Sequence, residues 1–231
     1  CKELGMYSEE VTLPEGSSQG EINEAVESLN QNSQIHAFII QYPFPGDLDY
    51  ESALLRVSPD KDADGLHPVN LGKLVQGILA PLACTPAGIQ FLLERYNVPI
   101  QGKHVVIVGR GLTIGRPLAN LLSLKRPNAN AVVTVVHTGA EDISQYTKQA
   151  DILIAAAGSP HMIKPEMVKP GAAVVAAGVS FSGKKLLSDV ADEVNEVAGW
   201  LSPRIGGVGP MTRAFLMANT VAAAEKSIGI L

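Results

Sequence analysis

Short apolar runs alternate with segments of helical periodicity over the second half of the chain. The runs are short, unbroken and rich in β-branched residues, which is typical of strands buried on both faces. They lie at Val105–Val108, Ala131–Val136, Asp151–Ala156 and Ala172–Ala177. Helices are expected between them at Arg116–Leu124 and Met162–Val168. This alternation predicts a doubly wound parallel sheet, with ligands at the carboxyl ends of its strands. A smaller strand and helix are expected at Leu187–Val190 and Val194–Ala198.

The first half shows a related pattern. An amphipathic helix is predicted at Gln19–Asn32, between possible strands at Glu10–Leu13 and Ala37–Ile40. A short helix is expected at Tyr50–Val57. This βαβ order predicts a parallel sheet in the first half as well, so the fold class is α/β.

Two further helices complete the prediction. Pro86–Tyr96 is expected to bridge the domains, with Thr85 as its N-cap. The apolar segment Arg213–Ile228 is expected to be the last helix, with Thr212 as a possible cap. The packed glycines of Gly206–Thr212 suit either close approach of a ligand or a tight turn between domains.

Composition narrows the class of protein. The 231 residues carry a net charge of −5, which argues against a nucleic-acid or membrane surface, and no apolar segment approaches the ~20 residues of a membrane span. The cysteines are Cys1 and Cys84, too few for a disulfide framework, so a reducing, cytoplasmic location is expected. Cys1–Gly5 resembles the end of a helix, and we expect residues upstream of it.

A glycine-rich turn follows the first predicted strand of the second half. Gly109, Gly111 and Gly115 have the spacing G-x-G-x-x-x-G, one residue longer than the usual dinucleotide fingerprint. A strand that ends in such a turn and opens a helix favours phosphate binding, because the helix N-terminus offers free N–H groups. A tight strand–helix turn without a ligand is the alternative. The flanking elements favour a Rossmann-like nucleotide site.

The end of the next predicted strand indicates which dinucleotide binds. An NAD site usually has an acidic residue there, whereas this strand ends in His137-Thr138-Gly139. Arg110 could pair with a 2′-phosphate. The sequence therefore favours NADP over NAD, although Glu141 and Asp142 lie nearby.

Other candidate chemistry is sparse. The acidic segment Ser58–Pro68 suits a solvated loop, and it lacks the glutamate that closes a calcium loop. The five histidines show no ligand spacing, so no metal site is predicted. No serine or cysteine nucleophile motif is present.

Four motifs in order resemble the bifunctional methylenetetrahydrofolate dehydrogenase/methenyltetrahydrofolate cyclohydrolase family. They are Gln41-Tyr-Pro-Phe-Pro45, Pro59-Asp-Lys-Asp-Ala-Asp-Gly65, Gly109-Arg-Gly with Gly115-Arg-Pro117, and Gly206-Gly-Val-Gly-Pro-Met-Thr212. The resemblance implies NADP-dependent oxidation of 5,10-methylenetetrahydrofolate, followed by hydrolysis of the methenyl product to 10-formyltetrahydrofolate. It further implies two α/β domains with the folate in the cleft between them, a last helix that returns to the first domain, and a homodimer. The implied division is a folate-binding catalytic domain, residues 1–86 with 213–231, and an NADP-binding Rossmann-like domain, residues 87–212.

The resemblance also implies roles for individual residues. Asp64 matches the carboxylate that accepts from the pterin, and Gln41 matches the glutamine that supports the catalytic lysine. The remaining roles are binding ones. Pro43, Gly209 and Pro210 would line the folate pocket; Gly109, Arg110, Gly111 and Gly115 would hold the cofactor phosphates; Thr138 would lie at the 2′-phosphate and Val179 at the nicotinamide.

The sequence departs from the family pattern in several places. The catalytic tyrosine and lysine of the family lie just upstream of the position that Cys1 matches, and we expect them to precede Cys1 in the natural protein. Gly111, Ala176 and Ile205 replace a serine, an aspartate and a proline. Two alternatives stay open: a non-catalytic or impaired folate- or NADP-binding form, and a dehydrogenase of the same architecture for another substrate, such as a shikimate-type enzyme.

Overall fold

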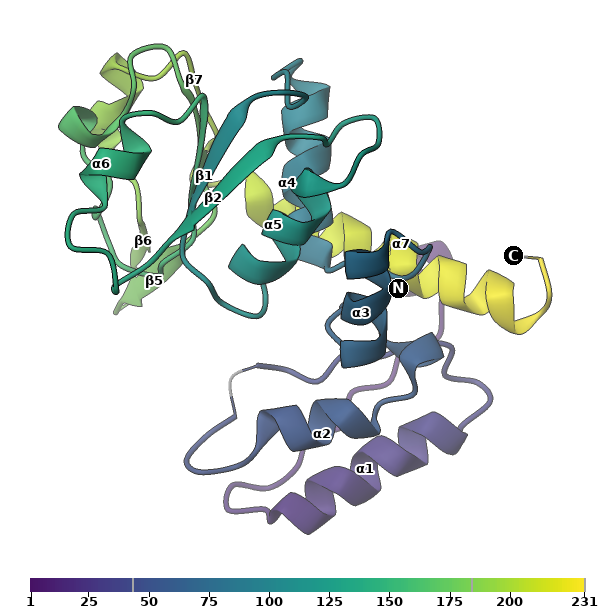
Figure 1. Cartoon of the computed structure of the whole chain (residues 1–231). Coiled ribbons are helices and arrows are strands. Elements are labelled where there is room, and N and C mark those ends of the chain that lie inside the picture. The colour runs from purple at the N-terminus through teal and green to yellow at the C-terminus, as the bar shows by residue number, and fades with distance from the viewer. Residues whose placement is uncertain (43, 184, 231) are drawn as a thin grey trace.

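A five-stranded parallel sheet forms the centre of the second half of the chain. The computed structural model describes residues 1–42, 44–183 and 185–230 (Figure 1). The sheet has the order β2-β1-β3-β4-β7. Its strands are β1 (His104–Val108), β2 (Val132–Val136), β3 (Ile152–Ala155), β4 (Ala173–Ala176) and β7 (Trp200–Leu201). Four of these strands were predicted to within a residue or two, and β7 was not predicted.

Successive side chains of β1 enter two different cores. Val105 and Ile107 pack with the helices on one face of the sheet, and Val106 and Val108 pack into the core on the other face. All four side chains are fully buried or nearly so. A strand buried on both faces reads as a continuous apolar run, which is the pattern seen in the sequence. The doubly wound parallel sheet is therefore confirmed.

Different helices cover the two faces of the sheet (Figure 1). The first core contains side chains of α4, α5 and α7, and the second contains residues of the segments around α6, η3 and η4. Their bounds are α4 (Cys84–Arg95), α5 (Gly115–Ser123), α6 (Ser144–Thr147), η3 (Pro165–Met167), η4 (Asp192–Glu196) and α7 (Val208–Ser227). The helix predicted at Met162–Val168 is only the short 3₁₀ turn η3, and the one at Val194–Ala198 is η4.

An antiparallel hairpin lies outside the main sheet. β5 (Val179–Ser182) pairs with β6 (Lys185–Ser188), and its Phe181 side chain is largely exposed. The sequence predicted a strand at Leu187–Val190 but gave no sign of its partner. Val179–Ser182 lacks the apolar run that marked the buried strands, because both faces of β5 are at least partly exposed.

The first part of the chain is mainly helical. It contains η1 (Lys2–Leu4), α1 (Gln19–Gln31), α2 (Tyr50–Arg56), η2 (Pro59–Lys61) and α3 (Pro68–Gln76). A capping box begins α1, with Ser18 accepting from the Glu21 N–H and the Glu21 carboxylate accepting from the Ser18 N–H. The helices α1 and α2 were predicted, and α3 was not.

The two strands predicted in this part are wrong. Neither Glu10–Leu13 nor Ala37–Ile40 forms a strand, and within the described residues their only pairing is an isolated bridge between Phe38 and Asp62. A cavity of about 760 Å³ lies between the two segments and is lined by both. A strand needs a neighbouring backbone to donate to and accept from, and across this cavity neither segment reaches the other.

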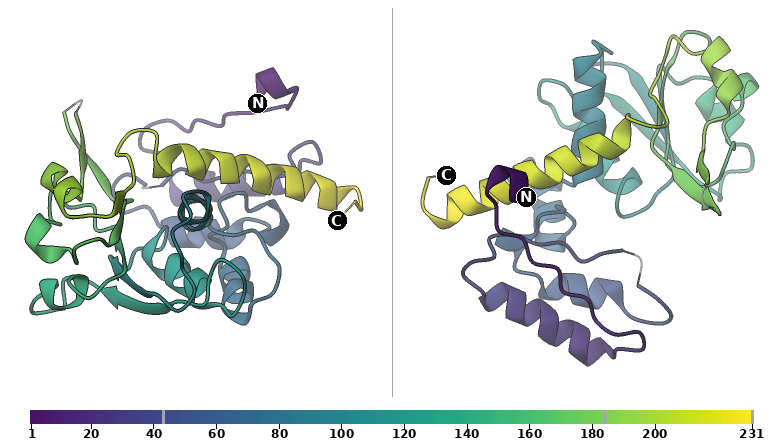
Figure 2. Two further views of the ribbon diagram at one scale, coloured as in Figure 1. Left: turned by 90° about the horizontal axis from the view of Figure 1, so that it is seen from above. Right: turned by 180° about the vertical axis from the view of Figure 1, so that it is seen from behind.

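Helix α7 joins the two parts of the molecule. It runs from the sheet past α4 toward the amino-terminal helices (Figure 2), which agrees with the predicted return of the last helix. The predicted caps are wrong, because α4 begins at Cys84 and α7 at Val208, which places Thr85 and Thr212 inside the helices. Their hydroxyl groups lie 2.9 Å apart and link α4 to α7.

Candidate functional site

The glycine-rich turn brings three backbone segments into close contact. Gly109 has φ +126°, and a Cβ atom there would overlap the carbonyl oxygen of Ala156 at the end of β3. A Cβ atom at Gly115 would overlap the carbonyl oxygen of Gly109. Both positions therefore require glycine. Gly111 differs, since a Cβ atom there would meet no described atom within 4 Å.

The first turn of α5 faces this cradle. The residue before the helix, Ile114, provides no side-chain cap, so within the described structure no side chain of the N-cap residue occupies the first N–H groups. The Arg116 N–H donates to the Gly111 carbonyl at 3.2 Å and Pro117 has no N–H, so it is the positive end of the helix dipole, rather than a set of free N–H groups, that favours an anion at this place. The phosphate site at Gly109, Gly111 and Gly115 stays a prediction, and the tight turn at Gly109 and Gly115 is compatible with it.

Arg110 and His137 form a pair of donors beside the turn. Nδ1 of His137 accepts a hydrogen bond of 3.0 Å from the Gly139 N–H. The neutral ring then carries its proton on Nε2, which lies 3.3 Å from Nη1 of Arg110. Two N–H donors facing each other suit an anion that accepts from both. Thr138, next to His137, is exposed at the end of β2.

Asp64 has a half-buried carboxyl group. Burial, followed by the nearby charge of Asp62, raises its pKa, while the neighbouring thiol of Cys84, whose proton points to the Ala63 carbonyl, partly opposes this shift. The same burial and the two carboxylates raise the pKa of Cys84 to about 12, so this cysteine is a thiol at neutral pH. A partly desolvated carboxylate with unused acceptor positions is suited to bind a ligand with N–H donors.

Asp62 builds the loop that carries Asp64. Its buried carboxylate accepts from the backbone N–H groups of Gly65 at 2.9 Å, Leu66 at 3.3 Å and His67 at 2.8 Å. It also accepts from the Asn70 side-chain amide at 2.9 Å. Sequence reasoning missed this role, because the sequence does not show which aspartate of an acidic loop is buried and hydrogen-bonded to the loop backbone.

Tyr50 connects the Asp64 loop to the Gln41 segment. Burial and the charge of Asp64 raise the pKa of Tyr50 to about 12, and its ring packs edge-on against Tyr42 with the centroids 5.0 Å apart. Gln41 precedes Tyr42, is exposed, and donates to the Tyr42 carbonyl at 3.1 Å. Pro43 lies outside the described residues. Tyr50 thus lies near Asp64 and contacts Tyr42, the residue that follows Gln41.

A buried carboxylate also organises the carboxyl ends of β3 and β4. Asp189 is fully buried and accepts from the N–H groups of Ala157 at 2.7 Å and Gly158 at 2.8 Å. A Cβ atom at Gly178 would overlap this carboxylate. Val179 follows Gly178 and is partly exposed. Asp189 was not predicted as a site residue.

The glycines before the last helix differ from the prediction. Gly209 and Pro210 were expected in a loop, but they lie in the first turn of α7. Gly207 precedes the helix, where a Cβ atom would overlap the carbonyl oxygen of Pro203, and Gly206 has φ +82°. Close backbone approach accounts for Gly207, and the left-handed backbone conformation accounts for Gly206.

The glycine-rich turn and the Asp64 loop meet in one apolar cluster. Leu112, from the turn, packs against the cluster that contains Leu66 and Ala83. Leu66 lies two residues after Asp64, and Ala83 precedes Cys84, whose N–H donates to the Asp64 carbonyl at 3.1 Å. The candidate phosphate site and the candidate substrate carboxylate therefore belong to one region of the molecule.

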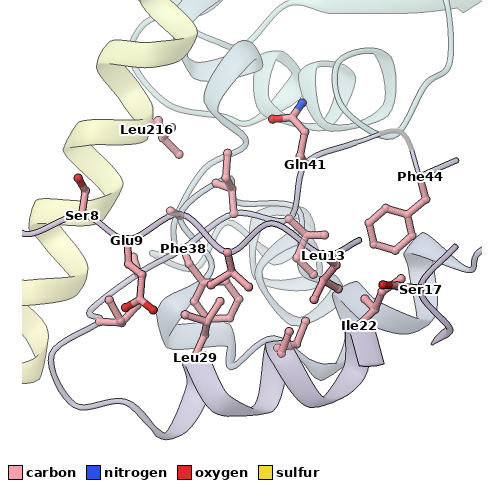
Figure 3. A pocket seen from close by; sticks show the side chains of 18 of the residues that line it. Ser8, Glu9, Leu13, Ser17, Ile22, Leu29, Phe38, Gln41, Phe44 and Leu216 are labelled. Carbon is pink, nitrogen blue, oxygen red and sulfur yellow. The ribbon is translucent and has the colours of Figure 1, made fainter. Parts of the chain in front are cut away.

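The large cavity between α1 and the extended segments has mainly apolar walls. Figure 3 shows Leu13, Ile22, Leu29 and Phe38 lining it, with Gln41 at its edge. Asp64 does not line it. Over the ranges that the structure describes, no group of three or more His, Cys, Asp or Glu side chains could hold a metal ion. None of the helices in those ranges is long and apolar enough to cross a membrane.

Comparison with known proteins is consistent with this arrangement. Residues 1–64 match the catalytic domain model of tetrahydrofolate dehydrogenase/cyclohydrolase, and residues 83–228 match its NAD(P)-binding domain model. Bifunctional protein FolD of Syntrophotalea carbinolica is 52% identical over 226 residues, covering 98% of this chain and 78% of the relative.

Solved structures give the same result. The FolD enzyme of Campylobacter jejuni is 37% identical with a TM-score of 0.86, over 91% of this chain and 74% of that one. The FolD of Trypanosoma brucei, solved with NADP cofactor and inhibitor, is 35% identical with a TM-score of 0.86, over 94% and 76%. The chain belongs to the tetrahydrofolate dehydrogenase/cyclohydrolase family.

Proposed function

We propose that this protein oxidises 5,10-methylenetetrahydrofolate with NADP and hydrolyses the 5,10-methenyl product to 10-formyltetrahydrofolate. The observation that carries the proposal is that Leu112 of the glycine-rich turn packs in the cluster that flanks Asp64. A dinucleotide site and a ligand-binding carboxylate thereby adjoin. The formyl product is a one-carbon donor suited to purine biosynthesis.

Asp64 binds the pterin in this proposal. A pterin edge offers neighbouring N–H donors, and a carboxylate supplies the matching pair of acceptors. The backbone on both sides of Asp64 is fixed, through Asp62 to Gly65 and through the Cys84 N–H to the Asp64 carbonyl. A fixed loop keeps the carboxylate oriented without loss of entropy on binding. Gln41, Gly209 and Pro210 line the remainder of the folate site in this proposal.

The residues around the glycine-rich turn fit NADP. A Cβ atom at Gly109 or Gly115 would overlap a backbone carbonyl oxygen, so these glycines keep the turn tight, whereas Gly111 has open space around it; the positive end of α5 beside the turn suits the pyrophosphate. Arg110, His137 and Thr138 offer donors for the 2′-phosphate. When bound, NADP accepts the hydride from the folate.

The chain's own residues position the reactants. Asp189 fixes the N–H groups of Ala157 and Gly158 beside Val179, where the nicotinamide end of the cofactor would lie. The buried cluster around Leu66 and Ala83 excludes water from the floor between the two sites. Holding hydride donor and acceptor in a fixed relation supplies much of the rate enhancement in such reactions.

The division of the chain follows from these roles. We place the folate-binding catalytic domain at residues 1–86 with 213–231 and the NADP-binding domain at residues 87–212. The contact of α7 with η2 and the hydrogen bonds from Asn219 to the carbonyl oxygens of Ala63 and Leu82 support the assignment of the last helix to the first domain. We also propose a homodimer, since β2 is an edge strand with Val132 and Val135 exposed, and a cytoplasmic location, since Cys84 is a free buried thiol.

The first test concerns the substrate. Asp64→Ala in the natural gene product should raise the KM for 5,10-methylenetetrahydrofolate by about tenfold or more, because loss of a paired acceptor costs ~1–3 kcal/mol. The rate of NADPH formation is measured by absorbance. Asp60→Ala, an exposed aspartate on the same loop, is the matched control and should leave KM unchanged. Absence of NADP-dependent turnover in the unmodified protein would refute the proposal.

The second test concerns the cofactor. Arg110→Ala should weaken NADP binding by about tenfold and leave NAD binding within about twofold, because only NADP carries the 2′-phosphate. Calorimetric titration with each nucleotide gives both affinities. Arg126→Ala, an exposed arginine beyond α5, serves as control. Equal losses for NADP and NAD would show that Arg110 does not read the 2′-phosphate.

A further inference from the structure

A polar side chain of the last helix reaches the loop that carries Asp64. Nδ2 of Asn219, in α7, donates to the carbonyl oxygens of Ala63 at 2.9 Å and Leu82 at 3.0 Å. It also lies 3.5 Å from Sγ of Cys84. Asn219 is half-buried in a helix that is otherwise largely apolar along this face. Helix α7 thereby links the backbone segments of Ala63 and Leu82, which lie next to Asp64.

These contacts complete a clamp around Asp64. On one side, the Gly65 N–H is held by Asp62. On the other, the Ala63 carbonyl accepts from Asn219 and from the Cys84 thiol at 3.3 Å. The Asp64 carbonyl accepts from the Cys84 N–H. The backbone around Asp64 is thus fixed from its own loop and from α7, while its side chain remains available.

We propose that Asn219 is a positioning residue for folate binding, which acts by holding the Ala63 carbonyl and so the direction of the Asp64 carboxylate. This inference rests on the proposed role of Asp64 as the pterin acceptor. Asn219 supplies both N–H groups to carbonyl oxygens of two different segments. A side-chain amide has two N–H donors on one nitrogen, which match these two carbonyl acceptors. Loss of the amide leaves two partly buried carbonyl oxygens with fewer donors, and the loop is free to turn.

The test compares two substitutions on one helix. Asn219→Leu removes the amide with little change in volume, and Asn219→Ser provides a smaller polar replacement if the leucine variant folds poorly. Either should raise the KM for 5,10-methylenetetrahydrofolate about tenfold and leave the Kd for NADP within about twofold. Thr220→Val is the matched control, because the Thr220 hydroxyl donates only within the helix, to the Leu216 carbonyl at 2.8 Å. It should change neither constant.

A double-substitution cycle separates positioning from general stability. In an Asp64→Ala background, Asn219→Leu should raise KM by less than about twofold, since no carboxylate remains to be oriented. Effects that simply multiply would overturn the inference, as would equal losses of folate and NADP affinity. A wild-type KM in the Asn219 variants with a raised KM in Asp64→Ala would refute only the role of Asn219. A wild-type KM in both would refute the role of Asp64.

Discussion

Three aspartates at alternate positions of one loop have three different environments. Asp60 is exposed and pairs with Lys226 at 2.6 Å. Asp62 is buried and accepts four hydrogen bonds. Asp64 is half-buried with a raised pKa. At the scale of the residue, only the last combines desolvation with unused acceptor positions, and such a charge costs stability in the free protein.

That cost predicts that the difference in stability between the wild type and a variant without the Asp64 charge depends on pH. Because burial raises the pKa of folded Asp64, the native state keeps the proton at pH values where the unfolded chain has lost it. Stability contributed by this group therefore falls as the pH rises from about 4, the ordinary value, through the raised pKa. Asp64→Asn avoids the charge and should have a higher Tm than the wild type at neutral pH.

The difference should vanish below about pH 4, where both states of the wild type are protonated. Thermal unfolding followed by circular dichroism across this range measures it. Asp60→Asn, at an exposed position, is the control and should not reproduce the pH dependence. A lower Tm for Asp64→Asn at neutral pH would mean that the carboxylate stabilises the fold.

At the scale of the element, a lysine from a separate loop closes the end of α1. Nζ of Lys61 donates to the carbonyl oxygens of Leu29, Asn30 and Asn32 at 3.1, 2.7 and 2.8 Å. These carbonyls lack helical partners at a helix C-terminus, where a positive charge also favours the dipole. Partial burial lowers the pKa of Lys61, because the ammonium group has lost part of its hydration and is hydrogen-bonded to these carbonyl oxygens instead.

Removal of this ammonium group should weaken the first part of the molecule. Lys61→Met keeps the length of the side chain and should cost about 1–3 kcal/mol of unfolding free energy, because three acceptors lose a charged donor. Urea denaturation measures the loss. Lys226→Met, which breaks only the exposed pair with Asp60, should cost less than about 1 kcal/mol. Equal costs would remove the special role of Lys61.

Sequence periodicity predicted the strands that are buried on both faces. It failed where contacts with residues distant in the sequence determine the local structure. β1, β3 and β4 are buried on both faces, so their apolar runs were sufficient. Ala37–Ile40 has the same composition, but only Phe38 forms a backbone bridge. Thr85 and Thr212 had the residue type of caps, yet they bond to each other across two helices. Such long-range partners leave no local pattern.

The residues of the candidate site also fall into those that the sequence could predict and those that it could not. The glycines at positions 109 and 115 could be recognised because a turn of fixed shape requires them. Asp62, Asp189 and Asn219 could not, because each acts on backbone groups that are distant in sequence or hidden in a loop. Their residue types alone are equally compatible with an exposed surface.

At the scale of the whole molecule, close packing of α4 on α7 joins the two parts. A Cβ atom at Gly88 of α4 would lie 2.8 Å from Cβ of Met211 in α7. Phe91 and Phe215 pack edge-on one turn further along, with ring centroids 6.0 Å apart. The missing side chain at Gly88 therefore sets the distance between the two helices.

Insertion of one methyl group at this contact should be costly. Gly88→Ala should lower the unfolding free energy by about 1–3 kcal/mol, since overpacking outweighs the gain in helix propensity. Gly72→Ala in α3, where a Cβ atom would meet no described atom within 4 Å, should instead raise it by up to about 1 kcal/mol. Urea denaturation compares them, and a stabilising effect at Gly88 would contradict the packing argument.

The hydrogen bond from Asn219 to Ala63 spans 156 residues of sequence. During translation, the loop of Asp64 leaves the ribosome long before its helical partner is made. The strands of the intervening sheet can pair in that interval, whereas the carbonyl oxygens of Ala63 and Leu82 lack their Asn219 donor until α7 is made. A nascent chain arrested before α7 should therefore acquire a protease-resistant sheet while the segment around Ala63 is still readily cleaved.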